Sequence, residues 1–138
     1  MKAELKYINQ LLDLENKVFP SNRLSRRSME RFIKQGNITV ITRFNKVIGS
    51  IIVLIRKDSS AVKIYSLAVD PDYQGQGIGK QLIASITAPE IRLEVREDNH
   101  KAIEFYKKQG FEEFGKHKKY YEDGVDALKM KKKLIASS

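Results

Sequence analysis

The most informative residues of this chain are three glycines, Gly75, Gly77 and Gly79, which alternate with larger residues. They follow an apolar run and the turn-forming pair Asp70-Pro71, and a helix-forming segment begins directly after them. Glycine lets a backbone approach phosphate oxygens closely, and successive N–H groups in such a loop point at one spot. The helix adds unpaired N–H groups and the positive end of its dipole. The stretch therefore predicts a loop that binds a pyrophosphate.

Two common phosphate-binding motifs do not fit this loop. A P-loop requires G-x-x-x-x-G-K-[ST], but Lys80 stands where the second glycine belongs. The dinucleotide fingerprint G-x-G-x-x-G fails because the glycines have the wrong spacing. What remains is Q-x-x-G-x-G, formed by Gln74, Gly77 and Gly79. A glycine-rich turn that precedes a helix and binds no ligand stays open as the alternative.

Glu94 and Tyr106 are side chains that could act as a general base and a general acid. Glu94 interrupts an apolar strand, and a tyrosine phenol is protonated at neutral pH. From the residues alone, Glu94 could equally be a charge on the strand's solvent side, and Tyr106 a core aromatic of an amphipathic helix.

The composition bounds the class of protein. The chain has 138 residues, of which 41% are hydrophobic, and this suits one domain with its own core. It has no cysteine, which excludes disulfides, thiolate metal sites and a cysteine nucleophile, and no metal is expected. His100 and His117 are expected at the surface. No apolar run could span a membrane and no signal sequence is evident, so a cytoplasmic location is expected.

The net charge of +9 indicates either an acidic ligand or a solvated basic face. Part of the excess could serve a phosphorylated cofactor. Aromatic and basic residues do not interleave as they do in platforms for single-stranded nucleic acid, so nucleic acid is not expected as a substrate.

Periodicity and turn residues predict a mixed α/β protein. Ser25 and Asn99 are expected as helix N-caps, and Gly36 and Gly110 as C-terminal stops. Strands are expected at 38–44, 47–56, 61–69, 91–95 and 125–132, and a further strand is expected to begin at 111–113. Helices are expected at 6–18, 25–36, 78–86 and 99–110. This order predicts an antiparallel first half and at least one parallel crossover.

The second half of the chain extends the pattern of the glycine loop. Leu93-Glu94-Val95-Arg96 leads to Asn99, Ala102 and Tyr106, and the segment from Tyr120 to Ala127 follows Gly110-Phe111. Together with Gln74, Gly77 and Gly79, this block resembles the GNAT superfamily of N-acyltransferases. Within the superfamily it resembles the RimI-like branch, which acetylates N-terminal α-amino groups. The resemblance covers about residues 62–130.

The resemblance implies a GNAT fold for residues 1–138, taken as one domain. That fold has a central mixed sheet of six to seven strands with about four flanking helices. Two parallel strands, here 61–69 and 91–95, splay apart to admit acyl-CoA.

The resemblance also assigns the site residues. It implies that Glu94 is the catalytic base and Tyr106 the acid toward the CoA thiolate. Backbone groups of Leu67, Ala68 and Val69 would pair with the pantetheine arm, which Asn99 and Tyr106 also contact. Tyr120 and Tyr121 would frame the acceptor slot. The pyrophosphate would be bound by backbone N–H groups of Gln74, Gly75, Gln76, Gly77, Ile78, Gly79 and Lys80.

The predicted function is therefore acetyl-CoA-dependent N-acetylation of a primary amine, foremost the N-terminal α-amino group of a protein or peptide. Two alternatives stay open. One is the same reaction on a small-molecule amine or a lysine side chain. The other, of a different class, is a non-catalytic CoA-binding or ribosome and RNA interaction module. The protein is expected to be a monomer or homodimer with no membrane partner.

Overall fold

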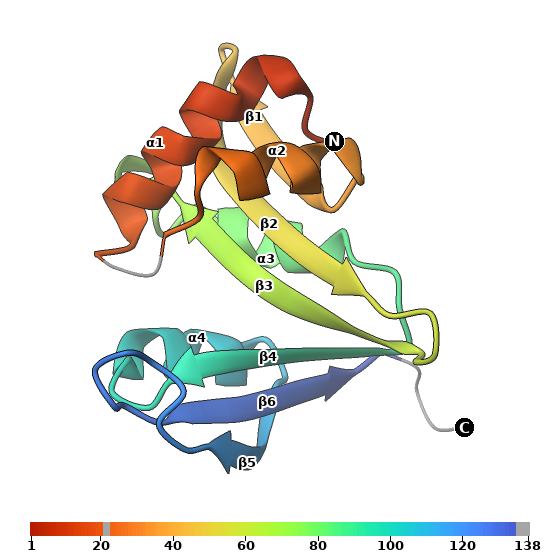
Figure 1. The fold of residues 1–138 in the computed structure, drawn as a ribbon, viewed down its shortest axis with the longest axis vertical. Helices are drawn as coiled ribbons and strands as arrows, with labels where there is room; N and C mark the ends of the chain where they lie inside the picture. The colour runs from red at the N-terminus through yellow and green to blue at the C-terminus, as the bar shows by residue number, and fades with distance from the viewer. Residues whose placement is uncertain (21–22, 135–138) are drawn as a thin grey trace. The chain divides into compact units, whose positions relative to one another are not determined.

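The computed structural model describes residues 1–20 and 23–134, so residues 135–138 of the predicted domain lie outside the described residues, as do 21–22. Figure 1 shows the elements. In chain order they are η1 (Leu5–Tyr7), α1 (Ile8–Val18), α2 (Arg26–Lys34), β1 (Ile38–Arg43), β2 (Lys46–Ile55), β3 (Ala61–Val69), η2 (Pro71–Tyr73), α3 (Ile78–Ala84), β4 (Glu90–Arg96), α4 (His100–Lys108), β5 (Glu112–His117) and β6 (Ala127–Lys133).

The six strands form one mixed sheet in the order β1-β2-β3-β4-β6-β5. β1 pairs antiparallel with β2, and β6 pairs antiparallel with both β4 and β5. β3 and β4 pair in parallel over Ala61–Ile64 and Glu90–Leu93. The predicted mixed α/β class, the six strands and the four α-helices are confirmed.

The chain divides into two compact units. The first unit consists of Met1–Val53 and Ser66–Thr87. The second consists of Leu54–Tyr65 and the chain from Ala88 onward. Each unit is described by itself below.

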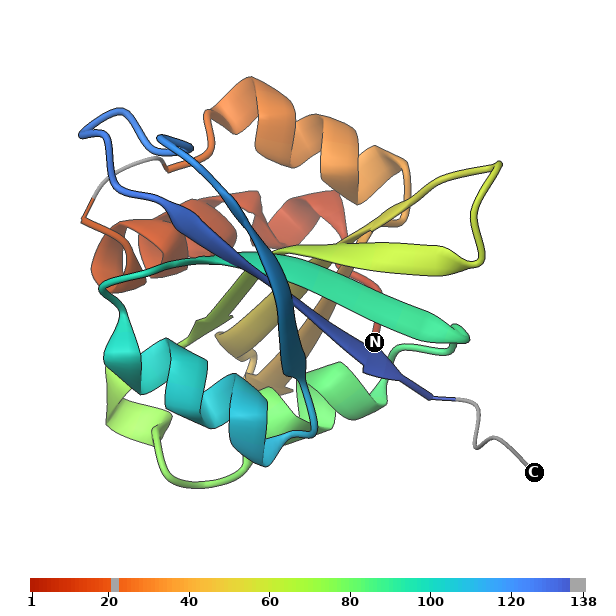
Figure 2. The same cartoon turned by 90° about the horizontal axis from the view of Figure 1, so that it is seen from below.

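Helices cover both faces of the β1–β2 hairpin in the first unit. Figures 1 and 2 show α1 and α2 on one face and α3 on the other. Ser25 caps α2 as predicted, because its Oγ accepts a hydrogen bond from the Ser28 N–H at 3.1 Å. Gly49 in β2 lets α3 pack closely, since a Cβ there would lie 2.6 Å from Ile78 Cγ2. This contact fixes the first residue of α3 and the loop that precedes it.

The second unit packs α4 on one face of β4, β6 and β5 (Figure 2). Alternation along β4 buries Ile91, Leu93 and Val95, while Arg92 and Glu94 belong to the opposite face. Asn99 caps α4 as predicted, with its Oδ1 accepting from the Ala102 N–H at 3.1 Å. The remaining buried residues of this unit include Ile64, Ile103, Phe111, Ala127, Leu128 and Met130.

The strand predicted to begin at 111–113 is present. β5 extends from Glu112 to His117, although every residue in it is exposed. Its partner β6 stabilises it through a ladder that pairs Glu112 with Lys131 and His117 with Ala127. An exposed edge strand has little apolar alternation, and for this reason the sequence pattern does not indicate where it ends. Within the described residues, no helix is both long enough and apolar enough to cross a bilayer.

Candidate active site

The glycine loop lies in the first unit, between the end of β3 and the start of α3. Gly75 and Gly77 have φ values of +81° and +77°, which lie in the left-handed region. Gly77 is the N-cap residue of α3. A Cβ on either glycine would meet no protein atom within 4 Å. The protein itself therefore requires these glycines for their backbone conformation, and close approach of a phosphate remains a prediction.

Asp70 anchors the start of this loop. Its side chain is only 2% exposed, and its Oδ1 accepts a hydrogen bond from the Asp72 N–H at 3.0 Å. Its other oxygen contacts Lys17 Nζ at 3.3 Å and Lys46 Nζ at 3.5 Å. The bond from Asp72 and the two ammonium groups hold the pKa of Asp70 below its usual value, against the effect of burial. Asp70 thus stays ionised and holds the turn in place.

Two cations of the β1–β2 hairpin also lie beside the loop. Arg43 Nη1 donates a hydrogen bond to Gln76 Oε1 at 2.7 Å, and its guanidinium lies 5.7 Å from the centre of the Tyr73 ring. Lys46 Nζ lies 6.0 Å from the same ring. Sequence reasoning missed Arg43 and Lys46, because more than 25 residues separate them from the loop and only the hairpin brings them near.

Leu67, Ala68 and Val69 end β3 just before the loop. Ala68 is buried, and Leu67 and Val69 are half-buried. All three lie beyond Ile64, the last β3 residue in the parallel register with β4. Their pairing with a pantetheine arm stays a prediction, as does pyrophosphate binding by the N–H groups of residues 74–80.

Glu94 lies on the polar face of β4 in the second unit, with its side chain 13% exposed. One carboxylate oxygen accepts a hydrogen bond from the Lys63 ammonium on the neighbouring strand β3. The other lies 3.3 Å from Nδ1 of His117 on β5. The strand alternation places Glu94 on the face opposite Leu93 and Val95, as the solvent-side interpretation requires. Its side chain is nevertheless mostly covered by its partners. The carboxylate of the proposed base therefore already accepts a hydrogen bond from an amino group, that of Lys63.

Lys63 and His117 are the neighbours of Glu94 that the sequence did not reveal. His117 is exposed as predicted, at 56% of its side chain, but it touches the carboxylate. Its ring also lies edge-on to Tyr120, with centroids 4.7 Å apart. The pairing of β5 with β6 brings His117 to Glu94, and β5 is the strand for which the sequence indicated only the beginning.

Tyr106 lies on α4 and packs edge-on against Phe111, with ring centroids 5.5 Å apart. Burial raises the pKa of its phenol, and the nearby Tyr121 acts in the same direction. The hydroxyl therefore keeps its proton throughout the neutral range. A protonated phenol could act as a general acid. The packing of the ring against Phe111 is equally consistent with the alternative role of a core aromatic residue.

Tyr120 and Tyr121 lie in the loop that joins β5 to β6, with ring centroids 5.1 Å apart. Neither residue is in a strand, so ordinary side-chain packing within a sheet does not account for them. The Arg96 guanidinium lies 4.9 Å from the Tyr121 ring, and burial raises the pKa of Tyr121 to about 12. Their contact with an acceptor stays a prediction.

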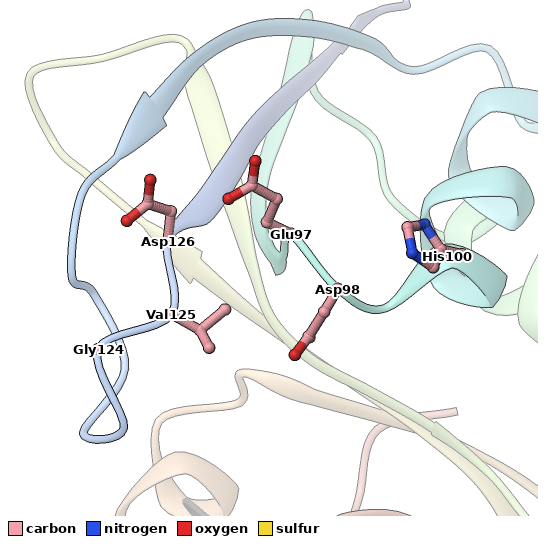
Figure 3. Close-up of a pocket in the computed structure, with 6 residues that line it drawn as sticks. All are labelled: Glu97, Asp98, His100, Gly124, Val125 and Asp126. Atoms are coloured by element: carbon pink, nitrogen blue, oxygen red, sulfur yellow. The ribbon is translucent and has the colours of Figure 1, made fainter.

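A shallow pocket of about 470 Å³ lies elsewhere in the second unit (Figure 3). The β4–α4 segment contributes Glu97, Asp98 and His100, and the segment before β6 contributes Gly124, Val125 and Asp126. Its carboxylates already have partners in Lys116, Arg96 and the Lys119 N–H. Among the described residues, no cluster of three or more histidines and carboxylates could hold a metal ion. None of the predicted catalytic residues lines this pocket.

Comparison with known proteins places the chain in a family. The acetyltransferase (GNAT) domain family matches residues 7–134. The N-alpha-acetyltransferase RimI of Mycobacterium tuberculosis is 36% identical over 75 residues, which are 51% of this chain and 48% of that protein. The peptidyl-lysine N-acetyltransferase YjaB of Salmonella typhimurium is 47% identical over 53 residues, which are 37% of each chain. The chain therefore spans about half or less of the length of these curated relatives.

A solved structure extends the similarity to the whole fold. Arabidopsis thaliana Naa50, in complex with the bisubstrate analogue CoA-Ac-MVNAL, matches with a TM-score of 0.80 and 29% identity over 97% of each chain. The predicted resemblance is thus confirmed, and acetyltransferases of the GNAT fold use acetyl-CoA as cosubstrate. By sequence match and by fold, the chain belongs to the acetyltransferase (GNAT) family.

Proposed function

We propose that the chain transfers the acetyl group of acetyl-CoA to the N-terminal α-amino group of a protein or peptide. One observation carries the proposal, namely that the mostly buried Glu94 carboxylate already holds an amine, the Lys63 ammonium. A general base must lie within hydrogen-bond reach of the proton that it removes. A carboxylate that accepts a hydrogen bond from an amine meets this requirement. The acceptor's amine takes the place of Lys63 when it binds.

Glu94 and Tyr106 perform the proton transfers in this proposal. Glu94 takes a proton from the acceptor ammonium, and the freed lone pair attacks the thioester carbonyl. A carbon–nitrogen bond forms, the carbon–sulfur bond breaks, and Tyr106 protonates the departing thiolate. An α-amino group has a pKa of about 7.7–8.0, so only modest help from a base is needed. The raised pKa of Tyr106 keeps its proton available.

The donor side rests on backbone groups. The left-handed conformations of Gly75 and Gly77 are those of a loop that can offer successive N–H groups to a pyrophosphate. Backbone N–H groups of Leu67–Val69 pair with pantetheine, and one of them stabilises the oxyanion. Asn99 and Tyr106 contact the pantetheine arm, and Tyr120 and Tyr121 frame the acceptor.

A lysine side chain is the second candidate acceptor. YjaB, a relative over 53 residues, is named a peptidyl-lysine N-acetyltransferase, whereas RimI is named an N-alpha-acetyltransferase. The similarity to RimI covers more of this chain, 51% against 37%, and favours the α-amine. Residues 1–138 are taken as one catalytic domain, monomeric or homodimeric, and a cytoplasmic location stays a prediction.

The test is release of CoA thiol in the presence of acetyl-CoA and matched acceptors. We expect turnover with a lysine-free peptide whose N-terminus is unblocked. We expect none with the same peptide blocked at the N-terminus and carrying one lysine, nor with a polyamine. Turnover only with the lysine peptide would establish the second candidate. Calorimetric binding of CoA without turnover on any acceptor would indicate the non-catalytic module, and absence of binding would contradict both enzyme proposals.

A further inference from the structure

An exposed aromatic ring on the same sheet as Glu94 is surrounded by cations. Phe114 on β5 is 37% exposed. The centre of its ring lies 5.5 Å from the Arg92 guanidinium, 5.3 Å from Lys129 Nζ and 5.2 Å from Lys131 Nζ. These four residues, here called the Phe114 cluster, come from three neighbouring strands. In both views α4 covers one face of these strands (Figures 1 and 2).

The cations of the Phe114 cluster are only partly neutralised by the protein. Arg92 pairs with Glu90 at 2.5 Å. In the described part of the chain, no carboxylate lies within 4.0 Å of the ammonium of Lys129 or Lys131, although Glu112 stands opposite Lys131 in the β5–β6 register. Arg92 and Lys131 face each other directly across β4 and β6. Like charges in directly opposed positions destabilise a sheet, and an anion bound there would relieve the repulsion.

The Phe114 cluster lies next to the proposed base. Lys129 stands directly opposite Glu94, and Arg92 is two residues before it on the same strand. Two residues of a strand span roughly 7 Å. An extended peptide advances about 3.3–3.6 Å per residue, so side chains at positions 2 to 4 of the acceptor can reach this distance from its reacting amine.

We propose that the Phe114 cluster selects acceptors with an acidic side chain at positions 2 to 4. The proposal rests on the proposed function, because it takes the amine at Glu94 as the origin of the peptide. Arg92, Lys129 and Lys131 receive the carboxylate, and the Phe114 ring packs against the methylene groups beside it. An RNA phosphate would offer the same charge, but it brings no amine for the neighbouring Glu94.

The first test compares peptides that differ only in charge. Glutamate is introduced singly at positions 2, 3 and 4 of a neutral peptide, and each peptide is paired with its glutamine counterpart. At low salt we expect kcat/KM to be roughly two- to fivefold higher for glutamate at one or more positions, the size of a partly exposed charge pair. The preference should disappear at about 1 M salt, where screening acts within roughly 3 Å.

A pair of charge reversals on one strand supplies the matched control. Lys131→Glu should abolish or invert the preference for the glutamate peptide. Lys132→Glu makes the same charge change one residue away, but Lys132 points to the α4 side, where its Cε would lie 3.4 Å from a Cβ on Gly110. It should therefore keep the preference of the unmodified chain.

The outcomes separate this inference from the proposed function. Turnover of the glutamine peptide reports the acetyl transfer itself, and its presence without any preference for glutamate overturns only the inference. Equal loss of preference in Lys131→Glu and Lys132→Glu would also overturn it, since it would indicate a general charge effect. Inhibition by an RNA oligonucleotide without a glutamate preference would assign the Phe114 cluster to nucleic acid instead.

Discussion

The candidate functional groups of the two units differ in kind, because one unit offers backbone groups and the other offers side chains. The first unit relies on backbone conformation, with Gly75 and Gly77 in left-handed geometry and the buried Asp70 fixing the turn before them. The second unit relies on side chains, with Glu94 between Lys63 and His117 and with Tyr106 packed against Phe111. Backbone N–H groups are present whatever side chains a loop carries, whereas the groups offered by side chains change with every substitution.

This difference explains which functional features follow from the sequence. Glycine spacing reports the backbone conformation of the loop at residues 74–80 directly, because only glycine adopts these φ values at no cost. Partners of a side chain come from strand register, which places Lys63 of β3 and His117 of β5 near Glu94 of β4.

Replacement of the proposed base should have the largest effect. Glu94→Gln keeps the shape of the side chain but cannot take up the proton of the amine. We expect kcat to fall by about 10²- to 10⁴-fold, the usual contribution of a general base. Affinity for acetyl-CoA, measured by calorimetry, should not change. Glu97→Gln is the control, because Glu97 accepts a hydrogen bond from Lys116 at 2.6 Å at the surface and should keep full turnover. Equal rates in both variants would remove Glu94 from the mechanism.

Removal of the Tyr106 hydroxyl should have an intermediate effect. Tyr106→Phe preserves the ring contact with Phe111 and deletes only the proton donor. We expect a fall of roughly 10- to 100-fold in kcat, at the lower end of acid–base effects, with little change in the KM for acetyl-CoA. Tyr7→Phe, at a buried tyrosine of the first unit, should leave the rate unchanged. An unchanged rate in Tyr106→Phe would leave Tyr106 a core aromatic only.

Substitution in the donor loop should weaken cosubstrate binding instead of chemistry. Gly77→Ala forces alanine toward φ +77°, which costs about 1–2 kcal/mol and disfavours the loop conformation. We expect the Kd of CoA to rise about tenfold.

Gly36 provides a matched control for this change. Its φ is +73°, and a Cβ there also meets nothing within 4 Å. Gly36→Ala should lose a similar free energy of unfolding in a urea titration while it retains the normal Kd. A loss of CoA affinity in both variants would mean that lower stability, and not the loop, accounts for the effect.

A pH-dependent stability difference is the smallest effect expected. Burial raises the pKa of Glu15 on α1, although the Ser66 hydroxyl, 3.1 Å away, partly opposes the shift. Its contribution to stability is therefore complete below the unfolded-state pKa, about 4.3, and is lost as pH rises through the higher folded-state value.

Glu15→Gln mimics the protonated form and should remove this loss. The free energy of unfolding of the variant, relative to the unmodified chain, should increase as pH rises above about 4.3. Urea titrations between pH 4 and pH 7 measure the difference. Glu30→Gln is the exposed control, because Lys34 lowers the pKa of Glu30, so its effect should have the opposite sign. A pH-independent difference for Glu15→Gln would contradict the burial argument.

Much of the fold was predictable because its signals are local. Ser25 and Asn99 cap their helices as expected, and all six strands occur in the predicted order. The full length of β5 was not predictable, since its residues are exposed and hydrogen bonds to β6 hold it. The partners of Glu94 and the cations beside the loop were missed for the same physical reason. Strand pairing, and not sequence spacing, determines which of these charges meet.

The most direct test of the central claim uses one peptide that carries both an α-amine and a lysine. The peptide is incubated with acetyl-CoA and the protein, and the acetylated position is identified by mass spectrometry. The account predicts acetylation at the N-terminus, with the rate reduced at least about a hundredfold in Glu94→Gln. Acetylation at the lysine, or an N-terminal product formed equally fast by Glu94→Gln, would contradict it.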